Sequence, residues 1–196
     1  MIDILQKAWE TVENFYKNGH INSERCLQAV LYHALRTSSL PEKDMILVEP
    51  KLGENIPDIV ICDDDQVKCI LELKCSPHSA VQKVPADLDK LIHYASKKGP
   101  RISLHTFGPD RVFNMKTKTW FGGKTDFLLT QETWYVFAVL ARHDDNAASL
   151  KGILKWRPSI GRLSRFCLLA GAMNPEASEK EDRCRFSISP IGELPR

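Results

Sequence analysis

Apolar residues in the first 40 positions recur every three or four residues, which is the spacing of an amphipathic helix. The first such segment ends at Asn18-Gly19, and Asn22 or Ser23 can cap the start of the second. The chain therefore predicts two helices before its first strand. The apolar stripes are Leu5, Ala8, Trp9, Val12, Phe15 and Tyr16 in the first helix, and Leu27, Val30, Leu31, Ala34 and Leu35 in the second.

Short apolar runs rich in β-branched residues follow these helices. Residues 45–48 predict a first strand, and residues 59–62 and 67–73 predict a hairpin because they flank a run of three aspartates. A third helix is expected to begin near Pro85, and residues 101–107 alternate as a strand. The apolar stripe of the third helix is Leu88, Leu91, Ile92 and Ala95.

The second half of the chain has a weaker pattern. Residues 111–115, 133–140 and 153–156 predict strands, separated by glycine and aspartate clusters. Residues 164–173 are apolar and fit either a strand or a helix. Residues 183–195 contain turn-forming residues and are expected to form a loosely held tail.

Together these elements predict an α/β protein with a mixed central sheet flanked by helices and a β-rich C-terminal extension. We expect a core of residues 1–110 and an extension of residues 111–196 that packs on it as one domain. A chain of 196 residues is long enough to bury a substantial core. No apolar run approaches the ~20 residues of a membrane span, so no membrane partner is expected.

Cysteine usage and charge add two expectations. The six cysteines show no CxxC pair and no regular spacing, which predicts reduced thiols in a cytoplasmic protein. The net charge is +2, but the first 96 residues carry a net −5 and the remaining 100 carry a net +7. An acidic half beside a basic half suits a polyanionic partner, although imbalances of this size also arise by chance.

Candidate chemistry lies in the predicted hairpin. Side chains alternate between the two faces of a strand, so Glu72 and Lys74 share a face and lie about 6–7 Å apart. Asp58 begins the partner strand, which the hairpin brings back toward Glu72. Two carboxylates with an adjacent ammonium suit metal-assisted phosphodiester hydrolysis, because Mg²⁺ takes oxygen ligands and a cation can stabilise the phosphate. The alternative is a surface hairpin whose charges are merely solvated.

The residues Pro57-Asp58 and Glu72-Leu73-Lys74, separated by a strand-length gap, resemble the signature of the PD-(D/E)XK nuclease superfamily. The resemblance covers a little over half of the chain. It implies a restriction-endonuclease-like core and a Mg²⁺-dependent nuclease, with Mn²⁺ as a possible substitute and DNA as the expected substrate. Asp58, Glu72 and the Leu73 backbone carbonyl would bind the metal, and Lys74 would orient or deprotonate the attacking water. Cutting of both strands would favour a homodimer.

Two further residues are candidates for the same site. Glu24 lies on the apolar stripe of the second helix, where a buried carboxylate needs a partner. The resemblance implies that Glu24 points to a metal or its water, whereas the alternative is a first-turn Glu that complements the helix dipole. Asp87, Lys90 and Tyr94 share one flank of the third helix. Some superfamily branches carry a QLxxY motif there, and this chain has Lys90 in place of the Gln. Lys90 can contact a phosphate or can be an ordinary solvated helix residue.

Basic residues alternate with aromatic residues in the second half, a mixture that suits contacts to a nucleic-acid backbone and stacking on bases. The same alternation arises where a sheet has one buried and one wet face. Beside the nuclease, a catalytically silent nucleic-acid-binding or assembly module with the same fold remains open, as does an RNA-directed enzyme. The predicted nucleic-acid contacts beyond Lys90 are Lys116, Lys118, Lys124, Lys155 and Arg157.

Overall fold

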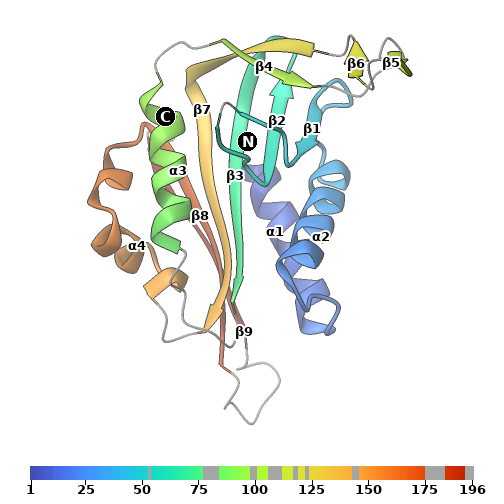
Figure 1. The fold of residues 1–196 in the computed structure, drawn as a ribbon. Coiled ribbons are helices and arrows are strands. Elements are labelled where there is room, and N and C mark those ends of the chain that lie inside the picture. Colours follow the sequence, from blue (N-terminus) through green and yellow to red (C-terminus); the bar gives the residue numbers. More distant parts are fainter. Residues whose placement is uncertain are drawn as a thin grey trace.

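A seven-stranded mixed sheet forms the centre of the protein (Figure 1). The strands lie in the order β1-β2-β3-β7-β8-β9, and β4 pairs with the first part of β7. The strands of this sheet are β1 Met45–Val48, β2 Ile59–Asp63, β3 Gln66–Ser76, β4 Arg101–His105, β7 Lys124–Arg142, β8 Arg165–Met173 and β9 Cys184–Gly192. A separate two-stranded ribbon consists of β5 Val112–Asn114 and β6 Thr119–Phe121. The computed structural model describes residues 1–52, 54–76, 84–97, 101–105, 112–116, 119–121, 124–142, 146–174 and 184–192.

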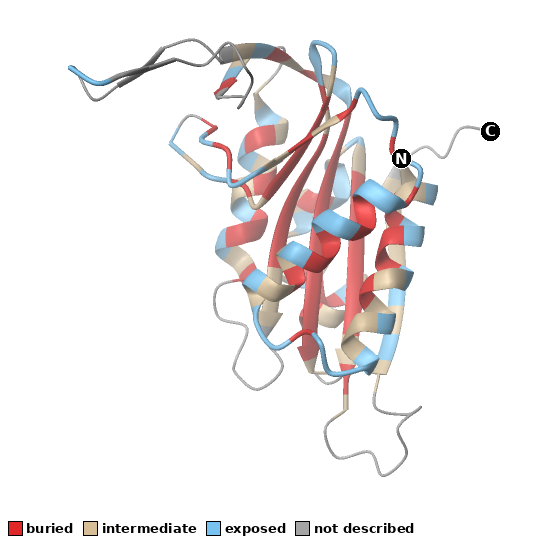
Figure 2. Ribbon diagram, turned by 90° about the vertical axis from the view of Figure 1, so that its right-hand side faces the viewer, coloured by how far each residue is buried: buried red, intermediate tan, exposed pale blue. Residues whose placement is uncertain are grey.

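Helices cover both faces of the sheet. α1 Ile2–Lys17 and α2 Glu24–Thr37 pack on one face, and α3 Val84–Ser96 and α4 Leu150–Trp156 lie on the other (Figure 1). Buried strands run between these helical layers in Figure 2. Two 3₁₀ helices flank α4: η1 Asn146–Ala148 and η2 Pro158–Arg162.

Each face of the sheet has its own hydrophobic core, because successive side chains of a strand point to opposite faces. Leu71 of β3 packs in the core beneath α1 and α2, whereas its neighbour Ile70 packs in the core beneath α3. Trp9 of α1 reaches the sheet, where its indole N–H donates to a carbonyl of β8 at 3.3 Å. Ser23 caps α2 as expected, since its hydroxyl accepts from the Cys26 N–H at 3.2 Å.

β7 joins the two halves of the sheet. Its first part pairs with β4, and its second part lies parallel to both β3 and β8. The register with β3 shifts after Val67, where residues 130–133 of β7 bulge out of the ladder. The Thr133 hydroxyl fills the gap: it donates to the Val67 carbonyl at 2.8 Å and accepts from the Thr130 N–H at 3.1 Å.

Most expected elements are confirmed: the mixed α/β class, the two N-terminal helices, the first strand, the hairpin and the third helix. The ambiguous segment 164–173 is a strand, β8. Residues 111–196 supply β7, β8 and β9 to the same sheet as residues 1–110, so the sheet crosses the expected boundary between core and extension.

Two expectations were wrong. Residues 153–156 belong to helix α4, whose start is fixed by Ser149 accepting from the Gly152 N–H at 3.1 Å. Residues 183–195 were expected to be a loose tail, but β9 pairs with β8 along its whole length. Phe186 and Ile188 of β9 pack against the α1–α2 core, and Pro190 is tolerated because β9 is an edge strand.

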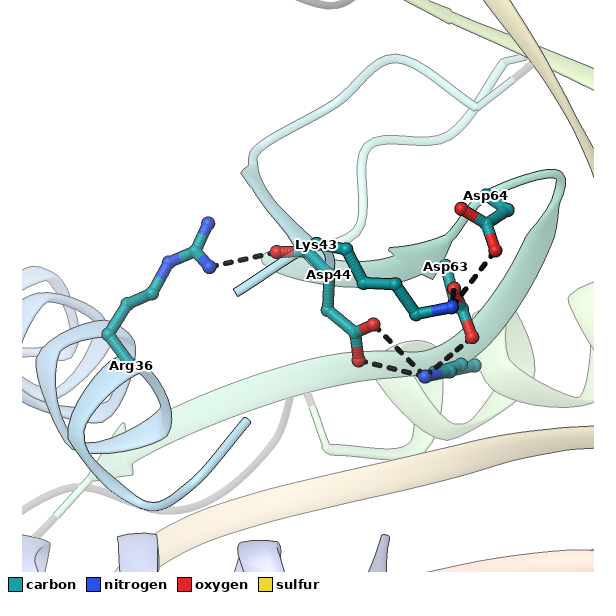
Figure 3. A network of polar contacts seen from close by, with 6 residues as sticks. Arg36, Lys43, Asp44, Asp63 and Asp64 are labelled. Carbon is teal, nitrogen blue, oxygen red and sulfur yellow. Dashed lines mark hydrogen bonds and ion pairs between the residues drawn. The ribbon is translucent and has the colours of Figure 1, made fainter. Parts of the chain in front are cut away.

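An ion-pair network ties the β2–β3 hairpin to the segment before β1 (Figure 3). The Asp44 side chain is fully buried and both of its oxygens accept from the Lys68 ammonium, at 2.9 and 3.0 Å. Lys68 also pairs with Asp63 at 2.7 Å, and Lys43 pairs with Asp63 at 2.9 Å. The Arg36 guanidinium donates to the Asp44 carbonyl at 2.8 Å, which connects the network to α2.

Asp63→Asn is expected to destabilise the protein at neutral pH but much less at pH 2. Hydrogen bonds from Lys68 and Lys43 lower the pKa of Asp63 to about 2. The unfolded value is about 3.9, so the stabilisation is present above that pH and is lost as pH falls toward 2. Urea unfolding of both proteins between pH 2 and 6 measures this. Asp65→Asn, at an exposed position of the same turn, is the control. A loss that does not change with pH would contradict the lowered pKa.

Candidate active site

The candidate site lies where β3 extends beyond its partner β2. β2 begins at Ile59 opposite Leu71, so the later residues of β3 have no strand on that side. Carboxylates take its place. The Leu73 N–H donates to Asp58 Oδ2 at 2.6 Å, and the Cys75 N–H donates to Glu24 Oε2 at 3.3 Å. The edge of the strand thus fixes two of the predicted acidic residues.

Helix α2 holds both acidic residues in position. Glu24 is the first residue of α2, and Gln28, one turn later, donates from its side chain to the Asp58 carbonyl at 3.1 Å. The Glu49 N–H donates to the same carbonyl at 3.0 Å. The backbone carbonyl of Asp58 is therefore held by α2 and by the residue after β1, and its side chain is held by β3.

Glu72 is the most buried charged residue of the site, with 1 % of its surface exposed. It points to the α3 side of the sheet, where its Oε2 lies 3.1 Å from the Lys90 ammonium. Its other oxygen, Oε1, is buried and accepts no hydrogen bond. A buried carboxylate oxygen without a donor is costly, so this atom is available to a further positively charged or hydrogen-bonding group.

Asp87 of α3 connects the two lysines of the site. Its oxygens lie 3.0 Å from the Lys90 ammonium and 3.1 Å from the Lys74 ammonium. Lys74 in turn lies 3.1 Å from Glu24. The result is a chain of alternating charge that runs Glu24, Lys74, Asp87, Lys90, Glu72 across three elements, α2, β3 and α3, with Asp58 beside it.

Burial and this chain of charges set the protonation of the site. Burial, together with the nearby charge of Asp58, raises the pKa of Glu72 to about 8 against the attraction of Lys90. Burial also raises the pKa of Asp58, which the Leu73 N–H partly offsets. Burial would lower the pKa of Lys74, but its pairs with Asp87 and Glu24 outweigh that and raise it. Lys74 is therefore an ammonium at neutral pH.

The donor set suits a hard divalent cation. Glu72 Oε1 is unpaired, Asp58 has a second oxygen beyond the one bound to Leu73, and the Leu73 carbonyl points to the same strand edge as its N–H. Within the described residues, no three His, Cys, Asp or Glu side chains form a complete metal site by themselves. Two carboxylates and a carbonyl would leave positions for water and phosphate, as Mg²⁺ prefers.

The structure thus brings together Asp58, Glu72, Lys74 and Glu24, which the sequence assigned to one site, with Lys90, which was expected to contact nucleic acid. The sequence places Asp87 on the same helix flank as Lys90, but no role was expected for it. The signal was present, because an aspartate three residues before a lysine on a helix forms an ion pair with it.

Tyr94, on the same flank of α3, is fully buried, and its hydroxyl forms no hydrogen bond. Burial raises the pKa of this phenol, and the charges of Glu72 and Asp58 raise it further. Tyr94 therefore lies beside the two carboxylates as a neutral group with an unused hydroxyl.

Among the described residues, the other predicted nucleic-acid contacts do not gather on one surface. Lys116 is exposed beside the β5–β6 ribbon and Lys155 is exposed on α4, and Figure 1 shows these elements on opposite sides of the molecule. Arg157 forms two bonds to Asp89 of α3, at 2.5 and 2.7 Å. Lys118 lies outside the described residues, as does the side chain of Lys124.

Comparison with known proteins leaves the family open, because no protein-family model, curated protein or solved structure matches the chain. The resemblance to the nuclease superfamily therefore depends on the motif residues and on the site that they form. In the described part of the chain, no helix has the length and apolar character needed to cross a membrane.

Glu72→Gln is expected to stabilise the protein, and the gain should grow with pH. The pKa of about 8 in the folded state exceeds the value of about 4.3 in an unfolded chain. The contribution of neutral Glu72 to the free energy of unfolding is therefore fully present below about pH 4.3. It is lost as the pH rises toward 8, because Glu72 then ionises in the folded state. One pKa unit corresponds to about 1.4 kcal/mol, so the gain should increase by more than that between pH 5 and 8.

The measurement is the free energy of unfolding in urea for both proteins at pH 5, 6.5 and 8, without divalent cations. Glu42→Gln, at an exposed position, serves as the control and should show no trend. Equal effects of Glu72→Gln at all three pH values would mean that Glu72 is ionised throughout.

Proposed function

We propose that this protein is a Mg²⁺-dependent nuclease of the PD-(D/E)XK type that hydrolyses phosphodiester bonds in DNA. One observation carries the proposal: Asp58 at the edge of β3 and the buried Glu72, which has one unpaired oxygen, interact through their charges, with the Lys74 ammonium held nearby by Asp87 and Glu24. Four carboxylates surround two lysines there, and the excess negative charge suits a divalent cation.

In this proposal Asp58, Glu72 and the Leu73 carbonyl hold Mg²⁺, or Mn²⁺ in its place. When bound, the metal polarises the phosphate and lowers the pKa of a coordinated water. Lys74, as an ammonium, stabilises negative charge on the phosphate and orients the attacking water. Its raised pKa favours this role over removal of a proton from that water. Glu24 orients Lys74 and is available to a second metal or its water.

The order helix, strand, hairpin, helix, strand over the first 105 residues supports a restriction-endonuclease-like core. All six cysteines are free thiols, which suits the reducing conditions of the cytoplasm. Cleavage of both DNA strands would need two such sites, which a homodimer provides.

A catalytically silent binding module is the second candidate. The observation that favours it is the ion pair between Lys90 and Glu72, which already occupies one oxygen of a metal carboxylate. A site that is balanced by its own lysines can retain its structure without a metal. An RNA-directed nuclease would use the same site, so RNA belongs in the same assay.

Lys74→Ala should abolish cleavage while leaving metal and DNA binding nearly unchanged. Lys74 is not a metal ligand in this proposal, and it is only one of several groups that would bind the substrate. A loss of at least about 100-fold in rate is expected when one charge-stabilising group is removed. Glu72→Ala should lose the metal as well. Ca²⁺ should support binding with little cleavage, because its ligand distances are longer and its geometry looser.

The assay scores metal binding, DNA binding and strand scission separately, for wild type and both variants, with Mg²⁺, Mn²⁺ or Ca²⁺. Lys51→Ala, at an exposed position, controls for the loss of a lysine. A wild type that binds DNA but cuts neither DNA nor RNA would favour the binding module. Full activity of Lys74→Ala would remove Lys74 from the mechanism.

The exposed basic residues outside the candidate site give a second prediction. If Lys116 and Lys155 contact phosphates, DNA affinity should fall steeply with salt, and replacing either by Ala should flatten the slope of log affinity against log salt by about one unit. Arg157→Ala should change the slope less, because its guanidinium is already paired with Asp89. Filter binding or fluorescence anisotropy across a range of salt concentrations measures the slope. An unchanged slope in the lysine variants would assign these lysines to the solvated surface.

A further inference from the structure

A cavity of about 660 Å³ lies between the end of α3, the start of the second part of β7 and the η2–β8 connection. This volume lies within the range of small-molecule sites. Leu129 and Leu163 contribute apolar walls, and Tyr135 also lines the cavity. The Ser164 hydroxyl donates to the Gln131 carbonyl at 3.4 Å, so the walls on β7 and before β8 are joined directly.

The charged groups of the cavity all have one sign. Lys97 and Arg162 line it, and none of the described residues around it is acidic. Neither side chain forms an ion pair within the described part of the chain. This contrasts with Arg157 and Lys90, whose charges are matched by aspartates. Two unmatched cations beside one concave surface favour an anionic ligand.

The remaining lining can recognise a flat polar ring. Leu129 and Leu163 provide apolar surface for the faces of a ring, and the amide of Gln131 offers both a donor and an acceptor to its edge. Burial raises the pKa of Tyr135 to about 12, so its phenol remains a hydrogen-bond donor at neutral pH. The cavity thus combines a ring-binding part with an anion-binding part.

We propose that this cavity binds a nucleoside monophosphate unit, either as a free nucleotide or within a single-stranded nucleic acid. The base would lie against Leu129 and Leu163, and the phosphate would contact Lys97 and Arg162. A nucleoside monophosphate joins an aromatic ring that carries donors and acceptors to a phosphate group, so it matches both parts of the cavity.

This second site is separate from the candidate active site. Lys97 follows Lys90 by seven residues, or about 10 Å along a helix axis. Ala95, which lines the cavity, is about 100° around α3 from Tyr94, on the flank away from the carboxylates. Binding there does not require the nuclease activity, so either proposal can fail alone.

Calorimetric titration of the full-length protein in EDTA tests the site with 5′-AMP, adenosine, inorganic phosphate and benzoate as probes. AMP should bind at least about tenfold more tightly than each of the other three, because only AMP fills both parts. Arg162→Ala and Lys97→Ala should each weaken AMP binding about tenfold, the loss expected for a charge-assisted hydrogen bond of about 1.4 kcal/mol. Lys151→Ala, at an exposed position on α4, should leave it unchanged.

A second arm uses a short single-stranded oligonucleotide under the same conditions. Loss of oligonucleotide binding in Arg162→Ala and Lys97→Ala, with weak binding of free AMP, would support the site. It would also identify the ligand as a nucleotide unit within a nucleic-acid chain rather than a free nucleotide. The proposal is overturned if neither probe binds, if benzoate binds as tightly as AMP, or if Lys151→Ala weakens binding as much as Arg162→Ala. Since all titrations are metal-free, a failure of DNA cleavage leaves their outcome unaffected.

Discussion

The unpaired edge of β3 determines the arrangement of the whole candidate site. Because β2 starts opposite Leu71, the N–H groups of Leu73 and Cys75 need acceptors that no strand supplies. Asp58 and Glu24 provide them. The need of these backbone N–H groups for acceptors thus positions one acidic side chain from a loop and one from a helix. This positioning does not depend on a ligand. Such preorganisation is what electrostatic catalysis requires.

Burial at this site opposes the ionisation of its acidic side chains. Glu72 lies in a nearly water-free position beneath α3, where an ionised carboxylate is unfavourable. Lys90 compensates one of its oxygens and leaves the other without a partner. Asp87 then balances both lysines, so that removal of any one member exposes the charge of its neighbour. Groups coupled in this way act as a unit, and their individual contributions are not additive.

Much of the fold could be predicted because local patterns agreed with the final packing. The helical stripe of α1, the Ser23 cap of α2 and the aspartate-flanked hairpin all specify their own structure. The expected convergence of Asp58, Glu72 and Lys74 followed from strand alternation and from the hairpin that returns Asp58 toward Glu72. One prediction failed where long-range pairing decides the outcome. The segment that forms β9 contains a proline and turn-forming residues, and only its ladder with β8 makes it a strand.

The same distinction applies to the functional residues. Ion pairing between Asp87 and Lys90 is local, but the contact between Asp87 and Lys74 depends on how α3 crosses β3. The cavity beside Lys97 and Arg162 joins segments some 65 positions apart, and no local pattern encodes it. Local sequence patterns therefore indicated the candidate residues on and beside β3. The further groups around them, such as Asp87 at Lys74, depend on tertiary packing.

The position of β7 has a consequence for how this chain acquires its structure during synthesis. β3 is made early, yet its parallel partner ends only at Arg142, after α3 and β4 have emerged. Pairing across so long an interval is slow, because loop closure precedes any gain from the contacts. Until β7 arrives, one edge of β3 has unpaired N–H and C=O groups and its apolar side chains are exposed, so other chains can pair with it. The nascent protein would thus be a natural client for a chaperone at this stage.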